Sequence, residues 1–214
     1  REIIARPDVD AVCISTPDHW HTVMALLAAR AGKDVYLEKP LTLTLREGRT
    51  LSDNIRSLGR VLQTGTQRRS SGVWRFMCEL AVNGYLGEIK TIHTWSSPGQ
   101  ACPPQPEMDV PPGLDYDLWL GPAPLAPYTP KRCHYTFRFV RDYSGGQITN
   151  NGAHYLDIAQ WALGMSHSGP VEIEGRGEYP RDGLFNTPVK YHIEYRYANG
   201  AVLIAEEDGS GVRI

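Results

Sequence analysis

The first third of the chain alternates between short apolar runs and longer segments with apolar residues at helical spacing. The run VDAVCIST at residues 9–16 is typical of a parallel strand that is covered on both faces. The next segment predicts a helix, with Asp18 placed to cap its start and Gly32 to close it. Two further strands are expected at residues 34–40 (DVYLEKP) and 61–69 (VLQTGTQRR).

A second helix is predicted between those two strands. Thr44 and Glu47 have the spacing of a capping box, and the helix is expected to reach about Leu58. Strands that alternate with helices through short connections are typical of right-handed βαβ units. The pattern therefore predicts an α/β fold with a doubly wound parallel sheet.

The pattern changes after residue 69. A helix is predicted over residues 73–82 and a strand over residues 88–95. The segment 97–130 is rich in proline and glycine, and we expect it to run over the surface. Apolar residues return to helical spacing over residues 152–163, where Gly164 ends the helix.

The last part of the chain alternates apolar and polar residues, as in VEIEGRGEY, VKYHIEYRY and AVLIAEED. A turn is expected at Asn199-Gly200, between two of these runs. The alternation predicts a mainly antiparallel sheet with one exposed face. We therefore expect two domains, a partial nucleotide-binding domain at residues 1–69 and an α+β substrate-binding domain at residues 70–214 that is incomplete at its C-terminus.

Charge and composition exclude several classes of protein. The 22 basic and 24 acidic residues are interspersed, so no basic surface for nucleic acid is expected. No run approaches the ~18 apolar residues that a membrane span needs. The four cysteines form no CxxC or CxxH pair, which argues against a zinc site and leaves the cellular compartment open.

Polar residues follow each of the three predicted parallel strands. STPDHWH follows the first strand, EKP ends the second, and TGTQRR ends the third. In a doubly wound sheet, ligands bind beyond the carboxyl ends of the strands. The sequence therefore predicts one crevice lined by all three segments.

Four segments together resemble a known family: STPDHWH, the helix ending in AGK, DVYLEKPLT, and GGQITNNGAHYLDIAQWALG. They are similar to the glucose-fructose oxidoreductase, inositol dehydrogenase and rhizopine catabolism (Gfo/Idh/MocA) family of NAD(P)-dependent oxidoreductases, over about residues 5–165. The resemblance implies a Rossmann-type sheet and NAD or NADP as cofactor. Members open with a GxGxxG segment that these 214 residues lack, so we expect an internal fragment of a longer protein.

The resemblance also implies a reaction, the transfer of a hydride between the nicotinamide and a secondary alcohol of a sugar or cyclitol. Such a site needs a base within reach of the hydroxyl proton. Lys39 and His154 are the candidates, because burial beside a cationic ring disfavours a charged lysine and a family histidine at this place exchanges the proton. Family members usually carry an aspartate where this chain has Asn150, and an amide cannot relay a proton. Asp157, on the same helix face as His154, could orient the imidazole instead, and a salt bridge or cap on the helix surface is an equally good account of it.

Further site residues follow from the same resemblance. The expected cofactor-binding residues are Ser15, Thr16, Pro17, Asp18, His21, Glu38, Lys39 and Pro40. The expected substrate-binding residues are Gln67, Arg68, Asn151 and His154. No metal is expected, because His19 and His21 do not share a helix face. Each choice has a plainer alternative, namely a solvated lysine paired with Glu38, an interior histidine at position 154, and ordinary loop polarity at positions 67 and 68.

Three functions stay open. The first is a sugar or polyol dehydrogenase, and the second is a glycoside hydrolase or lyase that oxidises its sugar transiently with no net redox change. The third is a non-catalytic sensor that binds the dinucleotide without turnover. In each case the partner is a small carbohydrate or polyol rather than nucleic acid or membrane, and a homo-oligomer is expected through the antiparallel sheet.

Overall fold

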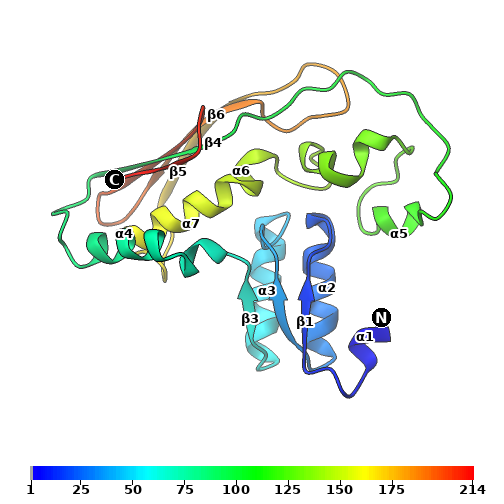
Figure 1. Ribbon diagram of the computed structural model, residues 1–214, viewed down its shortest axis with the longest axis horizontal. Coiled ribbons are helices and arrows are strands. Elements are labelled where there is room, and N and C mark those ends of the chain that lie inside the picture. Colours follow the sequence, from blue (N-terminus) through cyan, green and yellow to red (C-terminus); the bar gives the residue numbers. More distant parts are fainter. Residues whose placement is uncertain (1) are drawn as a thin grey trace. The chain divides into compact units, whose positions relative to one another are not determined.

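The computed structural model describes residues 2–214, which form two compact units (Figure 1). Unit 1 contains the residues up to 65 together with residues 104–145, and unit 2 contains residues 66–103 and 146–214. This partition differs from the expected cut after residue 69. Much of the Pro/Gly-rich segment groups with the parallel sheet of unit 1, although it lies far from that sheet in sequence.

The sheet of unit 1 is parallel, in the order β1-β2-β3. Its strands are β1 (Ala11–Ile14), β2 (Asp34–Leu37) and β3 (Leu62–Thr64). Ile14 pairs with Leu37, and Leu37 with Thr64, so the three strands end level with one another. This confirms the α/β prediction, although β3 is shorter than the expected strand at residues 61–69.

The helices of unit 1 are α1 (Glu2–Ala5), α2 (Asp18–Arg30) and α3 (Leu45–Ser57). Small side chains at Ala25 and Ala28 let α2 approach the sheet, and the core also contains Ile14, Val35, Leu37 and Leu51. Helices α2 and α3 lie side by side on one face of the sheet (Figure 1). Cys13 of β1 is exposed and Tyr36 of β2 stays 38% exposed. The described helices therefore cover these strands on one face, and not on both as expected for β1.

The capping predictions for these two helices have different outcomes. The capping box is confirmed, because Thr44 accepts from the backbone N–H of Glu47 and the Glu47 carboxylate accepts from the backbone N–H of Thr44. Asp18 is not the cap of α2, since Pro17 occupies that position and provides no side-chain cap bond. The Asp18 carboxylate instead accepts a 2.5 Å hydrogen bond from the hydroxyl of Ser144. A partner 126 residues away in the chain has replaced the local one.

The returning segment of unit 1 docks on the first turn of α2. It contains α5 (Tyr116–Leu120) and two short 3₁₀ helices, η2 (Pro130–Arg132) and η3 (His134–Phe139). The indole N–H of Trp20 donates to the carbonyls of Leu118 and Trp119 at 3.1 and 3.2 Å. The imidazole of His19 packs against the rings of Trp119 and Tyr143, with centroids 5.3 and 5.0 Å apart. These contacts explain why residues 104–145 belong to unit 1.

Unit 2 places helices against a five-stranded sheet in the order β5-β6-β7-β4-β8. Its helices are η1 (Gln67–Ser70), α4 (Gly72–Val82), α6 (Gln147–Asn150) and α7 (Gly152–Ala162). Its strands are β4 (Thr91–Ser96), β5 (Glu172–Glu178), β6 (Lys190–Arg196), β7 (Val202–Glu207) and β8 (Gly211–Arg213). Ile92 and Leu203 of the sheet pack with Ile158 and Ala162 of α7 in one core.

The sheet of unit 2 is mixed and mainly antiparallel. Strands β5, β6 and β7 pair antiparallel, and Gly200 adopts φ +85° in the turn between β6 and β7, as the sequence predicts. Strand β4 adds beside β7 in parallel, and β8 pairs antiparallel with β4. Among residues 2–214, no helix combines the length and apolarity that crossing a bilayer requires.

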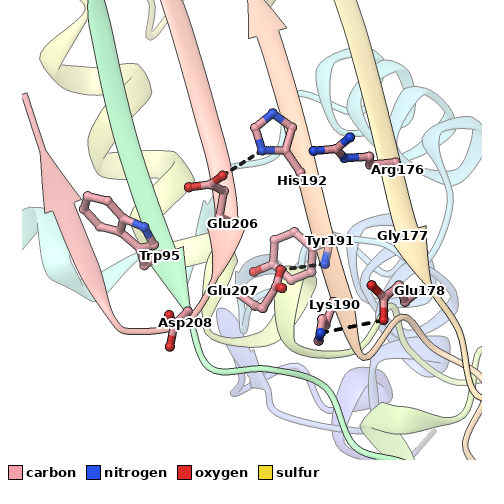
Figure 2. Close-up of a pocket in the computed structure, with 10 residues that line it drawn as sticks. All are labelled: Trp95, Arg176, Gly177, Glu178, Lys190, Tyr191, His192, Glu206, Glu207 and Asp208. Atoms are coloured by element: carbon pink, nitrogen blue, oxygen red, sulfur yellow. Dashed lines mark hydrogen bonds and ion pairs between the residues drawn. The ribbon is translucent and has the colours of Figure 1, made fainter.

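The face of this sheet opposite α7 carries a charged depression of about 690 Å³ (Figure 2). His192 on β6 and Glu206 on β7 point toward each other across it, with Nδ1 2.7 Å from the carboxylate (Figure 2). The other ring nitrogen of His192 lies 3.4 Å from the Glu194 carboxylate. This depression lies on the sheet of unit 2 and not at the carboxyl ends of β1, β2 and β3, so it is not the predicted crevice.

The pair of His192 and Glu206 predicts a pH dependence of stability. Its hydrogen bond to Glu206 raises the pKa of His192 above the reference value, against the opposing effect of burial. The stabilisation is therefore complete below the unfolded-state pKa of ~6.5 and is lost as pH rises through the higher folded-state pKa. Thermal unfolding measured across this pH range should show the fall in stability, and the His192→Gln variant should not show it. The exposed His167→Gln is the control, and an unchanged pH profile in His192→Gln would contradict the assignment.

Candidate active site

The carboxyl ends of β1, β2 and β3 form the base of the candidate site in unit 1. The backbone N–H of Glu38 donates to the carbonyl of Ile14 at 3.0 Å, and that of Gly65 donates to Leu37 at 2.8 Å. Because these strands end in register, the segments that begin at Ser15, Glu38 and Gly65 leave the sheet side by side. The parallel sheet thus brings together the first residues of the three polar segments, and the rest of the third segment, from Thr66, belongs to unit 2.

His21 joins two of these segments. Its imidazole is 1% exposed, with Nδ1 2.6 Å from the carbonyl oxygen of Pro40 and Nε2 2.9 Å from that of Thr16. Both ring nitrogens therefore face backbone carbonyls rather than an open crevice. We expected His21 to bind the cofactor, but in the structure this buried ring links the segment after β1 to the one after β2.

Lys39 follows β2 and is partly buried. Burial lowers the pKa of its ammonium group, the nearby charge of Asp18 opposes that shift, and Arg138 adds to it. A lowered pKa increases the fraction of lysine that is neutral and can accept a proton. The peptide between Lys39 and Pro40 is cis, and the chain bends at these two residues.

Asp18 is the buried acid of this cluster, at 8% exposure. Burial raises the pKa of its carboxyl group, and the hydrogen bond from Ser144 is the strongest opposing influence. Three basic side chains also oppose the rise, namely His21, Lys39 and Arg138. The carboxylate therefore accepts a hydrogen bond from Ser144 and feels the charges of three basic groups, one of which is the candidate lysine.

Glu38 and Thr16 complete the group of residues in unit 1. The Glu38 carboxylate accepts from the backbone N–H of Lys39 at 3.3 Å and lies against Gly65, where an added Cβ would approach it to 3.0 Å. The hydroxyl oxygen of Thr16 is buried and has no hydrogen-bond partner among residues 2–214. A buried polar atom without a partner is costly, and a ligand can satisfy it.

Unit 2 carries the remaining candidates. His154 lies on α7 and is 8% exposed. Asn150 ends α6, where its amide donates to the side-chain oxygen of Gln147 at 3.3 Å, and Asn151 precedes α7. Gln67 is exposed at the start of η1.

Arg68 follows Gln67 in η1. Its guanidinium lies over the ring of Tyr155, 3.9 Å from the centroid, and 5.6 Å from the ring of Trp74. Its assignment as a substrate-binding residue stays a prediction.

Asp157 forms a salt bridge, the second of the two roles that the sequence left open. Both of its oxygens accept from Arg69, at distances of 2.7, 2.8 and 3.0 Å. The carboxylate that the sequence offered as an orienting partner for His154 is thus held by an arginine of η1. Helical spacing correctly placed Asp157 on the face of His154, but it gave no sign of a cation from another element.

Sequence reasoning missed three residues of these clusters, Ser144, Arg138 and Arg69. Ser144 and Arg138 lie in the returning segment, where no periodic pattern signals a neighbour. Arg69 was visible only as the second arginine of TQRR. No group of three or more metal-ligating side chains lies together within the described part of the chain.

Comparison with known proteins decides the family. Residues 1–66 match the NAD-binding Rossmann fold of an oxidoreductase family, and residues 80–212 match its C-terminal alpha/beta domain. The chain belongs to the Gfo/Idh/MocA oxidoreductase family. This confirms the resemblance noted in the sequence, and the fold of both units agrees with it.

Individual members of the Gfo/Idh/MocA family match parts of the chain. A scyllo-inositol 2-dehydrogenase (NAD(+)) of Bacillus subtilis is 41% identical over 68 residues, which are 32% of this chain and 20% of that protein. A 1,5-anhydro-D-fructose reductase of Ensifer adhaerens is 40% identical over 86 residues, which are 40% of this chain and 26% of that protein.

Solved structures of the Gfo/Idh/MocA family show the same fold. An aldose-aldose oxidoreductase of Caulobacter crescentus superposes with a TM-score of 0.72 at 24% identity, covering 96% of this chain and 52% of that one. The chain thus spans about half the length of the solved relative that it matches.

Proposed function

We propose that this chain is part of an NAD(P)-dependent oxidoreductase that transfers a hydride between the nicotinamide and a secondary alcohol of a sugar or cyclitol. The supporting observation is that three parallel strands end level with one another, with Thr16 and Asp18 after β1 and Lys39 after β2, and that burial lowers the pKa of Lys39. The named relatives act on an inositol and an anhydro sugar, which supports this substrate class.

The residues after β1 and β2 fit a dinucleotide. Thr16 has a buried hydroxyl without a partner among the described residues, which a ligand could satisfy. The proposed cofactor-binding residues are Ser15, Thr16, Pro17, Asp18, Glu38, Lys39 and Pro40. His21 links two of their segments through the carbonyls of Thr16 and Pro40. When bound, NAD(P)⁺ supplies the hydride acceptor for the reaction.

The proton of the substrate hydroxyl is assigned to Lys39 and His154. An uncharged Lys39 takes this proton at Nζ, and a charged Lys39 polarises the hydroxyl oxygen. His154 is the second group that can accept or donate the proton. Asn150 stands where family members usually carry an aspartate. A proton taken up by His154 therefore cannot pass to a carboxylate at position 150. Gln67, Arg68 and Asn151 are proposed to bind the hydroxyl groups of the substrate.

A cofactor titration followed by a substrate panel tests this function. NADH and NADPH are titrated into the full-length protein while nicotinamide fluorescence is recorded, and oxidation of sugars and cyclitols is then followed by formation of the reduced cofactor. We expect micromolar cofactor binding and turnover of at least one polyol. Tight cofactor binding with no turnover on any substrate would contradict the proposal and favour the dinucleotide sensor.

A second candidate reaction is redox-assisted cleavage of a glycosidic bond. It is favoured by Asn150, whose amide bonds to Gln147 within α6 and cannot carry a proton away. Such an enzyme would consume a glycoside with catalytic NAD and accumulate no reduced cofactor. Product analysis with one glycoside therefore separates the two reactions.

The expected homo-oligomer is also part of the proposal. The sheet face that carries His192 and Glu206 bears side chains of both signs across several strands. A face with interspersed charges can be complementary to a second copy of itself across a twofold axis. Light scattering of the purified protein measures its mass directly.

A further inference from the structure

Three residues on one stripe of α7 form the basis of this inference. His154, Asp157 and Trp161 are spaced i, i+3 and i+7, so they follow one another along the same side of the helix. Arg69 of η1 contacts the second and third of them. Its guanidinium is bonded to Asp157 and lies 5.1 Å from the centre of the Trp161 ring.

The contact between Arg69 and Asp157 is strong and directional. Three N–H···O distances of 2.7 to 3.0 Å show a two-point contact in which Nε and Nη2 both take part. The two side chains are only 34% and 21% exposed, so solvent screens them less than a surface pair. A two-point arginine–carboxylate contact restricts orientation as well as distance.

The start of α7 has no side-chain cap among the described residues. Asn151 occupies the N-cap but makes no side-chain cap bond within the described chain, and Gly152 is the first helical residue. The first turn, which carries His154, is therefore not fixed by a cap of its own. Arg68, the residue before Arg69, stacks on Tyr155 of the same helix. Two consecutive residues of η1 thus contact α7. Viewed down the helix axis, Tyr155 and Asp157, which they contact, lie on opposite sides of His154.

We propose that Arg69 is a positioning residue, which acts through Asp157 and Trp161 to fix the rotation and depth of α7 and thereby the place of His154. The inference rests on the proposed function for its effect on turnover. It also gives Asp157 a role different from direct orientation of the imidazole. Loss of Arg69 should displace His154, although His154 and the residues next to it in the sequence are unaltered.

A double-mutant cycle tests the proposal in the full-length protein. The variants are Arg69→Ala, Asp157→Ala and the pair of both, and the readouts are hydrogen exchange of the α7 amides and steady-state kinetics. We expect faster exchange over residues 154–161 and a kcat about 10-fold to 100-fold lower in each single variant, because small misplacements of a reacting group have effects of that size. The double variant should be no worse than either single variant. The KM for the cofactor should not change.

Two further variants make the result specific. Arg75→Ala removes a matched ion pair, with Glu79 on α4, whose Nε–Oε1 distance is 2.7 Å, and it should leave both readouts unchanged. Arg69→Lys keeps the charge but not the two-point contact. This variant should therefore fold, with a kcat between those of Arg69→Ala and the unaltered protein. If Arg69→Ala does not fold, the comparison of Arg69→Lys with the unaltered protein takes its place.

The outcomes distinguish this proposal from the proposed function. Unchanged exchange in α7 would overturn the positioning role, whatever the activity. Faster exchange with unchanged kcat would overturn its link to the reaction. If exchange is faster in Arg69→Ala but the unaltered protein oxidises no polyol, the restraint on α7 is supported and the proposed function is contradicted. An effect of Asp157→Ala on the pH profile that Arg69→Ala does not share would return Asp157 to direct orientation of His154.

Discussion

Replacement of Lys39 by methionine is expected to lower kcat for alcohol oxidation by about 10²- to 10⁴-fold, the usual contribution of a positioned acid–base group. Methionine preserves much of the volume of the lysine stem but cannot accept a proton or polarise an oxygen. Because burial lowers the pKa of Lys39, the unaltered enzyme should also gain activity as pH rises through that pKa. The pH dependence of kcat/KM, measured by formation of reduced cofactor, tests both statements.

The same strand offers the control for this variant. Lys33 lies just before β2, where its ammonium group donates to the carbonyl of Arg6 at 2.8 Å, whereas Lys39 follows the other end of β2. Lys33→Met should leave kcat and its pH dependence unchanged. Normal turnover by a folded Lys39→Met variant with intact cofactor binding would contradict the catalytic assignment.

Substitution of Gly121 by alanine is expected to destabilise the protein by about 2–4 kcal/mol, since it combines overpacking with an unfavourable backbone conformation. Gly121 ends α5 with φ +50°, and a Cβ there would overlap the indole ring of Trp20. That ring is held in place by hydrogen bonds to the carbonyls of Leu118 and Trp119. Thermal and denaturant unfolding should both show the loss.

Gly59 shows what a positive φ costs where no overlap is present. It has φ +61°, but a Cβ there would meet no atom within 4 Å, so Gly59→Ala should cost only about 1–2 kcal/mol for the backbone conformation. Combining Gly121→Ala with Trp20→Ala should be less destabilising than the sum of the two changes, because the overlap is then removed. Equal losses in Gly121→Ala and Gly59→Ala would show that Trp20 does not exclude a side chain at position 121.

Local signals in the sequence predicted local structure well. The capping box at Thr44 and Glu47, the turn at Gly200 and the level ends of three parallel strands all depend on residues close in the chain or on the periodicity of one element. The family itself was recognisable because its motifs lie at those strand ends and on α7.

Features that depend on distant partners were not predictable in the same way. The alternation in β4 indicates a buried face but not that β7 is its neighbour, nor that the two run parallel. From the sequence, Asp18 is a reasonable helix cap, but in the structure its carboxylate accepts from the hydroxyl of Ser144. Asp157 is likewise a reasonable partner for His154, but it is bound by Arg69. In each case a long-range hydrogen bond competes with a local one, and the sequence pattern contains no measure of that competition.

The return of residues 104–145 to unit 1 means that the chain passes between the two units three times, after residues 65, 103 and 145. A single cut in the sequence therefore cannot separate the two units, because each unit contains two stretches of the chain. Residues up to 65, if produced alone, would lack the carbonyls that bind Trp20 and the hydroxyl that binds Asp18. Gene fusions, truncations and protease maps of this protein should accordingly treat residues 104–145 as part of unit 1, because the charged cluster around Asp18 is complete only when Arg138 and Ser144 are present.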